Sequence, residues 1–267
     1  MTAIILRLVR RCGLASLALV GSSAALTPAL AQQSGIDVLS GFSDLWSPGA
    51  TWDTGTPTAA GAAILRRNLE LSREIARNRS FEGELSAYLY DRRDQSYTMI
   101  GGLGRLADIY RRETGAFTSI LEMTDASLTQ KFSDTGNGAG NSNSGLGKVV
   151  DFVGSMRWPA TTTPAKNFYK YPRPYRQMLD GNSLVDIVAP HLRPAKSATP
   201  ATDGGFPSGH ANAAALAGFA FAYAVPQQFA DEIMLTAEVA HSRVVAGMHS
   251  PLDVIGGRMR SITPSRA

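Results

Sequence analysis

The chain has 267 residues, of which 44% are hydrophobic and 18% charged, and its formal net charge is +4. This composition is typical of a globular protein, and no Lys/Arg-rich run marks a nucleic-acid surface, so a nucleic-acid partner is not expected. The one cysteine, Cys12, lies in the N-terminal segment described next, which argues against disulfides, thiolate metal sites and a cysteine nucleophile.

Residues 1–31 have the pattern of a secretory signal peptide. Three arginines precede an apolar stretch at residues 14–26, and Ala29-Leu30-Ala31 fits an A-x-A cleavage site. The stretch is shorter than the ~20 apolar residues that a membrane-spanning helix needs. We therefore expect cleavage near Ala31, a periplasmic or secreted mature chain without stable membrane insertion, and 23 basic against 22 acidic residues in it.

The mature chain, residues 32–267, predicts one all-α domain, because apolar residues recur at helical spacing and strand alternation is scarce. Residues 32–57, rich in Gly, Ser, Thr and Pro, predict an irregular arm over the surface, and the Gly/Asn/Ser stretch at 133–147 predicts a mobile loop. The longest apolar run, 211–225, predicts a buried core helix. Further helices are predicted at 58–79, 82–93, 103–112, 116–130 and 175–180, and a short helix or turn is predicted at 184–188.

Three short blocks in the second half of the chain contain polar residues suited to chemistry. They are, in order, K-x6-R-P at 166–174, P-S-G-H at 207–210 and S-R-x5-H-x3-D at 242–253. Lys166, Arg173 and Arg243 supply three cations, which suits a phosphate monoester with close to two negative charges. The planar guanidinium of an arginine can bind two phosphoryl oxygens at once. The blocks therefore predict a phosphate-binding site.

The P-S-G-H block directly precedes the predicted core helix. Backbone N–H groups at a helix N-terminus favour anions, so Ser208 and Gly209 are expected to cradle the phosphate. Ser208 also suits the role of N-cap, and both roles can coexist because they use different atoms. The alternative of a serine hydrolase fits poorly, since the surrounding residues do not form a G-x-S-x-G elbow.

His249 and Asp253 are four residues apart, which places both side chains on one face of a helix. The carboxylate can then accept a hydrogen bond from the imidazole and fix its tautomer. Ser250 and Pro251 also indicate a helix start here, with Asp253 at the third position as part of an N-terminal cap. Orienting the histidine and capping the helix can coexist.

The three blocks, in this order and with every fixed position filled, resemble the signature of the PAP2 acid phosphatases, which share a fold with the vanadium haloperoxidases. The resemblance covers residues 166–253 and implies a helical bundle. It implies that His249 is the nucleophile that forms a phosphohistidine, that Asp253 orients it, and that His210 acts as general acid and base. It also implies that Lys166, Arg173, Ser208, Gly209 and Arg243 bind the substrate phosphate.

The resemblance is to the soluble bacterial class A acid phosphatases, and it implies hydrolysis of small phosphomonoesters without a cofactor. No cluster has metal-ligand spacing, so no metal is expected, and His191 and His241 lie outside the motif. A vanadate-dependent haloperoxidase, a lipid-phosphate or diphosphate phosphatase and an inactive phosphate-binding protein stay open as alternatives, as does a homo-oligomer. The chain stops fourteen residues after Asp253, so the last helix is expected to end early.

Overall fold

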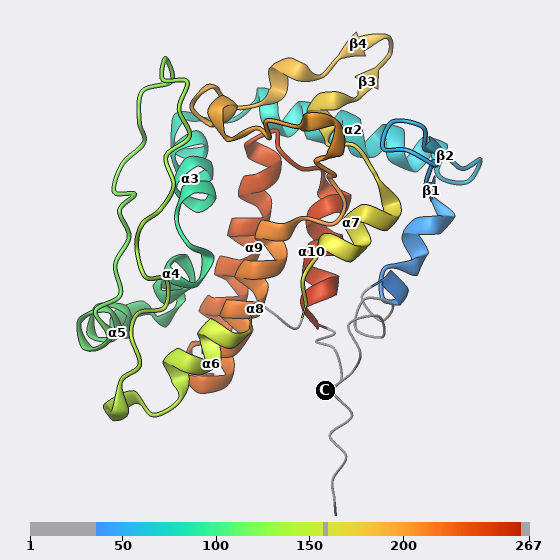
Figure 1. Cartoon of the computed structure of the whole chain (residues 1–267). Helices are drawn as coiled ribbons and strands as arrows, with labels where there is room; N and C mark the ends of the chain where they lie inside the picture. The colour runs from blue at the N-terminus through green and yellow to red at the C-terminus, as the bar shows by residue number, and fades with distance from the viewer. Residues whose placement is uncertain (1–35, 157–159, 263–267) are drawn as a thin grey trace, which may run out of the picture.

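The computed structural model describes residues 36–156 and 160–262, so the predicted signal peptide lies outside the described residues (Figure 1). Within them the chain is helical with two short β-hairpins, which confirms the all-α class. No helix among these residues has the length and apolar character needed to cross a bilayer. The helices are α2 (Ala62–Arg77), α3 (Phe81–Arg92), α4 (Gln95–Met99), α5 (Ala107–Thr114), α6 (Val149–Ser155), α7 (Thr163–Tyr169), α8 (Gly209–Ala224), α9 (Phe229–Val245) and α10 (Pro251–Ile262).

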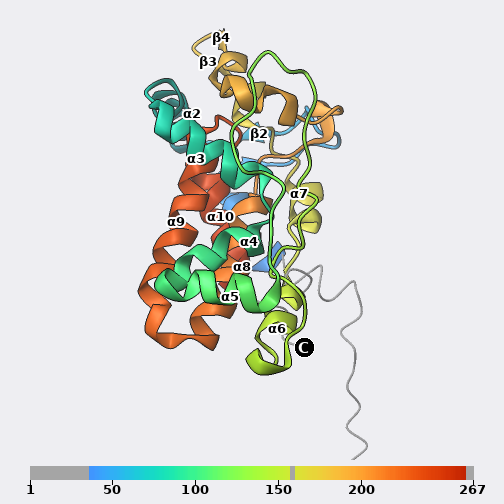
Figure 2. The same cartoon turned by 90° about the vertical axis from the view of Figure 1, so that its left-hand side faces the viewer.

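Three helices, α8, α9 and α10, lie side by side at the centre of the fold (Figure 1). A 3-10 turn, Pro226–Gln228, reverses the chain between α8 and α9. Helices α3, α4 and α5 cover one flank of these three, where they face the viewer in Figure 2, and α7 with the N-terminal segment covers the other. Helix α8 is buried along most of its length, as its apolar run predicts.

The N-terminal arm is part of the core, which corrects the prediction of an irregular segment laid over the surface. It forms a 3-10 helix at Ser40–Asp44 and a hairpin of β1 (Trp46–Ser47) with β2 (Thr56–Pro57). Phe42 is buried and stacks on Phe206 with ring centroids 3.7 Å apart. Because Phe206 directly precedes the P-S-G-H block, the arm packs against the chain at the start of that block. Its aromatic residues were too widely spaced to show a periodic pattern.

No helix forms over residues 116–130, so that prediction is wrong. Helix α5 ends at Gly115, whose φ of 61° places it in the left-handed region. The chain beyond is held by the carboxylate of Asp134, which accepts hydrogen bonds from the backbone N–H groups of Asp94 and Ser119 and from the Thr118 hydroxyl. These bonds replace the helical ones, and Phe117, Leu121 and Leu128 of this segment are exposed.

The helix predicted at 175–180 is also wrong. The chain makes a 3-10 turn at Pro174–Arg176 and then a hairpin of β3 (Met178–Leu179) with β4 (Asn182–Ser183). The two residues between the strands, Asp180 and Gly181, both have positive φ, as a tight primed turn requires. The Asp-Gly pair was the sequence signal for this hairpin.

Other predictions differ less from the structure. Helix α2 lies inside the predicted range 58–79, and α3 begins and ends one residue before the predicted range 82–93. The range 184–188 contains the 3-10 turn Val185–Ile187. The predicted 103–112 helix is divided between the end of a 3-10 segment, Ile100–Leu106, which is kinked at Gly104, and α5. The stretch at 133–147 is irregular apart from a 3-10 turn, Ser144–Leu146. Helices α4, α6, α7 and α9 were not predicted.

Glu232 on α9 is a fully buried carboxyl group, and neither of its oxygens has a hydrogen-bond partner among the described residues. It lies against Gly102, where a Cβ atom would come within 2.5 Å of the carboxyl carbon, so a larger residue there would have to displace the Glu232 carboxyl group. Burial, with a smaller effect from Asp231, raises the pKa of Glu232 to about 8. The folded protein therefore retains a proton that the unfolded chain releases above its ordinary value of 4.5.

We expect Glu232→Gln to stabilise the protein, and to do so more at pH 8 than at pH 5. The raised pKa means that stability falls as pH rises from about 4.5 to about 8, and the amide removes this loss. The gain at pH 8 should be on the order of 2 kcal/mol, or several degrees in Tm. Thermal melts at both pH values test this, with Glu238→Gln, an exposed position on the same helix, as control. Equal pH dependence in Glu232→Gln and the unsubstituted protein would contradict the expectation.

Candidate active site

The structure brings the eight predicted site residues together at one end of the central helices. Lys166 comes from α7, Arg173 from the loop after it, Arg243 from the end of α9 and Asp253 from the first turn of α10. His249 lies in the turn between the last two of these helices. The remaining three are at the start of α8: Ser208, Gly209 and His210.

His249 is buried, with 1% of its surface exposed, and both ring nitrogens face charged groups. Its Nε2 lies 3.0 Å from Nη1 of Arg173, and its Nδ1 lies 3.4 Å from Oδ2 of Asp253. A guanidinium can only donate, so Nε2 must be the acceptor in the first contact. The neutral ring therefore carries its proton on Nδ1, facing Asp253, and presents the Nε2 lone pair to the cations.

The charges around His249 favour its neutral form. Burial is the main cause that holds its pKa well below the usual value, and Arg173, Lys166 and Arg243 act in the same direction. Burial also raises the pKa of Asp253 to about 6, against the opposing effect of its hydrogen bonds to Ser250. The Nε2 atom of a histidine in this setting stays unprotonated even in acid solution.

The first turn of α10 holds Asp253 in place through a reciprocal cap. Ser250 N–H donates to Oδ2 of Asp253 at 2.8 Å, and the Asp253 N–H donates to the Ser250 hydroxyl at 3.3 Å. This is the capping box that the sequence predicts. Glycine at position 257 allows α10 to approach the start of α8, since a Cβ there would lie 2.4 Å from the Ser208 carbonyl oxygen. The cap and the close approach together position the carboxylate.

Arg243 and His210 are linked by Asp91 of α3, a residue that the sequence analysis did not single out. Arg243 is 1% exposed, and its Nη2 donates to Oδ1 of Asp91 at 2.6 Å. His210 Nε2 lies 3.2 Å from the Asp91 backbone carbonyl oxygen, which can only accept. Neutral His210 therefore has its proton on Nε2, and Nδ1 carries the lone pair.

The pKa values of this trio follow from burial and charge. Burial, followed by Arg243, lowers the pKa of His210 to about 4, although Asp91 opposes the shift. For Asp91, burial alone would raise the pKa, but Arg243, His210 and Arg92 together hold it below its usual value. In the absence of a bound anion, the trio thus consists of an anionic Asp91, a cationic Arg243 and a mostly neutral His210.

Lys166 and Arg173 form the other side of the cluster. The Lys166 ammonium donates to the Gly204 carbonyl oxygen, and burial, followed by the charge of Arg173, lowers its pKa to about 8. Arg173 donates through Nη2 to Asp203 at 2.9 Å, and its Nε lies 2.7 Å from the second carboxylate oxygen as an ion-pair contact. No motif indicated Asp203. Both cations therefore face backbone or carboxylate oxygens.

The start of α8 offers donors in a different way from the prediction. The Ser208 N–H, expected to face the phosphate, donates to the Asp253 carbonyl oxygen at 2.8 Å. The Ser208 hydroxyl accepts from Ala211 N–H at 3.4 Å, as an N-cap does. The hydroxyl hydrogen of Ser208 can still donate to an anion. The Gly209 N–H, at the first position of the helix, can do the same.

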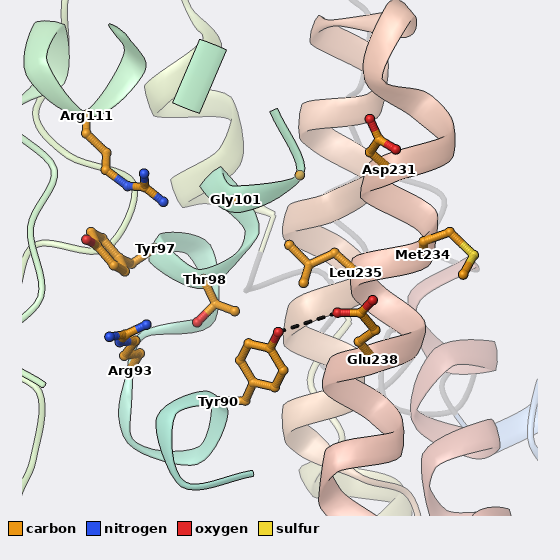
Figure 3. Close-up of a pocket in the computed structure, with 11 residues that line it drawn as sticks. Tyr90, Arg93, Tyr97, Thr98, Gly101, Arg111, Asp231, Met234, Leu235 and Glu238 are labelled. Carbon is orange, nitrogen blue, oxygen red and sulfur yellow. Dashed lines mark hydrogen bonds between the residues drawn. The ribbon is translucent and has the colours of Figure 1, made fainter. Parts of the chain in front are cut away.

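Two further pockets lie outside this cluster, and none of the eight residues lines either. One, of about 390 Å³, lies between α3, α4 and α9, where Tyr90 faces Glu238 (Figure 3). The other, of about 770 Å³, lies between the N-terminal arm, α2 and the β3–β4 hairpin. Within residues 36–156 and 160–262, no three His, Cys, Asp or Glu side chains are grouped so as to hold a metal ion.

The fold and the cluster define a helical domain built around a polar site of histidines, arginines, a lysine and helix-end donors, a setting suited to a phosphoryl group. Residues 149–264 match the family model of the PAP2 superfamily. The matched range contains all eight site residues. Searches of curated proteins and of solved structures gave no significant match.

Proposed function

We propose that the protein is a phosphatase that hydrolyses phosphate monoesters through a phosphohistidine at His249. The proposal depends on the position of the buried His249 imidazole between Arg173 and Asp253. Its Nε2 lone pair faces the Arg173 guanidinium, and its Nδ1 faces the Asp253 carboxylate. The PAP2 match supports a phosphoester hydrolase in general. The finer assignment, to a secreted class A-like acid phosphatase, rests on the motif spacing and on the pattern of residues 1–31.

In the first proposed step, Nε2 of His249 forms a bond to phosphorus while the ester P–O bond breaks. The leaving oxygen takes a proton from His210, and Asp253 offsets the positive charge that develops on the His249 ring. In the second step water attacks phosphorus, His210 takes a proton from it, and the N–P bond breaks. Lys166, Arg173 and Arg243 stabilise the negative charge on the phosphoryl oxygens throughout.

Substrate binding would favour protonation of His210, which the first step needs as a proton donor. The pKa of His210 is about 4 in the site without an anion, where Arg243 and burial disfavour the charged ring. A bound phosphate dianion acts in the opposite direction and raises that pKa, because a nearby negative charge favours the protonated form. His210 is thus expected to take up a proton with the substrate and to be ready as the general acid.

We expect the protein to hydrolyse a chromogenic aryl phosphate with chelator present. The rate should be highest in acid and should fall as pH rises to 8. Two groups lose charge in that direction: His210, and then Lys166, whose pKa is about 8. Because substrate raises the pKa of His210, kcat should persist to higher pH than kcat/KM. A rate that rises steadily from pH 5 to 8 would contradict the roles given to these two residues.

Vanadate is expected to inhibit competitively, since it can adopt the five-coordinate geometry of the phosphoryl transition state. Inhibition constants measured with the same aryl phosphate test this, and lack of inhibition would count against the assignment. Halide oxidation with added vanadate and no phosphatase turnover would instead identify a haloperoxidase. Phosphate binding without either activity would identify an inactive member.

A further inference from the structure

Asp203 occupies the side of Arg173 that is best suited to a phosphoryl group. One oxygen of its carboxylate accepts a hydrogen bond from Nη2 of Arg173 at 2.9 Å, and the other lies in ion-pair contact with Nε at 2.7 Å, so both oxygens face one edge of the guanidinium. Carboxylates and phosphates bind this edge with the same geometry, each through two oxygens. A substrate phosphate that used the same edge would have to replace Asp203.

The rest of Arg173 is also engaged. Its Nη1 donates to the Met248 carbonyl oxygen at 3.0 Å and lies 3.0 Å from Nε2 of His249, the nitrogen assigned as nucleophile. While Asp203 holds the guanidinium in this position, the lone pair that would attack phosphorus accepts a hydrogen bond from Arg173. The arrangement therefore blocks both the cation and the nucleophile.

The three carboxylates of the cluster differ in how firmly they are held. Asp91 and Asp253 are buried, at 6% and 0% side-chain exposure, and Asp253 is fixed by the cap on α10. Asp203 is 21% exposed and belongs to the loop between the Pro200–Thr202 turn and the P-S-G-H block. Within the described part of the chain, Arg173 is the only hydrogen-bond partner of its carboxylate. It is thus the one of the three best able to move aside.

We propose that Asp203 is an internal competitor for phosphate: it closes the anion site by binding Arg173 and is displaced when a phosphoryl group arrives. The proposal rests on the phosphate site described above and adds a residue that sets the affinity of that site. A partly exposed ion pair is weakly held, whereas a dianion gains contacts with three cations and the start of α8. Displacement is therefore favourable, but it lowers the apparent affinity for phosphate by the fraction of molecules that are closed.

Binding of inorganic phosphate, measured by calorimetry on the full mature chain, tests the proposal. Asp203→Asn removes the competing charge at nearly constant size, and its Kd for phosphate should be lower than that of the unsubstituted protein by roughly fivefold or more. Asp53→Asn is the matched control, because Asp53 pairs with Arg176 at 2.6 Å in an exposed contact nearby and lies outside the cluster. The control should leave the Kd unchanged.

The alternative role for Asp203 is to position Arg173 for catalysis, and it makes the opposite prediction. In that case Asp203→Asn would bind phosphate no better or more weakly, and its kcat would fall. For a competitor, KM for an aryl phosphate should fall with the Kd while kcat is maintained. An unchanged or raised Kd, or no phosphate binding by either protein, overturns the proposal. Tighter binding by Asp203→Asn with no hydrolysis by either protein would support it and contradict the proposed phosphatase activity instead.

Discussion

His249→Ala is expected to abolish turnover of an aryl phosphate while the protein stays folded. The substitution removes the only group assigned to form the covalent intermediate, so kcat should fall on the order of 10³-fold or more. The fold should survive, because Arg173 keeps its hydrogen bonds to the Met248 carbonyl oxygen and to Asp203 without the imidazole. Steady-state kinetics and a thermal melt of the purified variant provide the two measurements.

The control for this substitution is His241→Ala, an exposed histidine of α9 outside the cluster. It should change neither kcat nor Tm appreciably. If His249→Ala kept its kcat within tenfold of the unsubstituted protein, another group would have to be the nucleophile. If it failed to fold, phosphate binding by His249→Gln would show whether the cation cluster is intact without the imidazole.

Asp91→Ala is expected to destabilise the protein severely. It leaves the Arg243 guanidinium, 1% exposed, without the carboxylate at 2.6 Å that balances its charge. Breaking one partner of a buried ion pair costs about 3–5 kcal/mol, which for a chain of this size is on the order of 10 °C in Tm. Asp186→Ala, in the exposed pair with Arg77, should cost no more than about 1 kcal/mol.

The loss at Asp91 should depend on pH in a defined direction. The pKa of Asp91 is below its usual value in the folded protein, so the stability it contributes is present at neutral pH and is lost as pH falls through the folded pKa. The difference in Tm between Asp91→Ala and the unsubstituted protein should therefore shrink in strong acid. The double variant Asp91→Ala with Arg243→Met should be more stable than Asp91→Ala alone, because the buried charge of Arg243 is no longer left unpaired. Equal Tm for Asp91→Ala and Asp186→Ala would contradict the account.

The site could be predicted from the sequence to the extent that its residues occur in short, ordered blocks. His249 and Asp253, four residues apart, lie close together, with Nδ1 3.4 Å from Oδ2. His249 lies in the turn before α10, however, and not on the helix that the sequence analysis expected. The cap at Ser250 followed from the same local pattern. What distinguished these features is that the interacting residues lie within one turn of each other.

Asp91 and Asp203 were missed because their partners are distant in sequence. Asp91 is 152 residues from Arg243, and Asp203 is 30 from Arg173, so no local spacing connects them. The same reason explains the N-terminal arm, whose Phe42 stacks on Phe206 from the far half of the chain. At residues 116–130, side-chain hydrogen bonds to Asp134 outweighed a weak helical pattern. Contacts of this kind are decided by packing, which one sequence does not display.

The most direct test of the central claim is the stereochemical course of hydrolysis at phosphorus, measured with a monoester made chiral by isotopic and sulfur substitution. Transfer to His249 and then to water consists of two in-line displacements, each of which inverts the configuration. The account therefore predicts net retention. Net inversion would mean that water attacks the substrate directly, and it would contradict a phosphohistidine at His249.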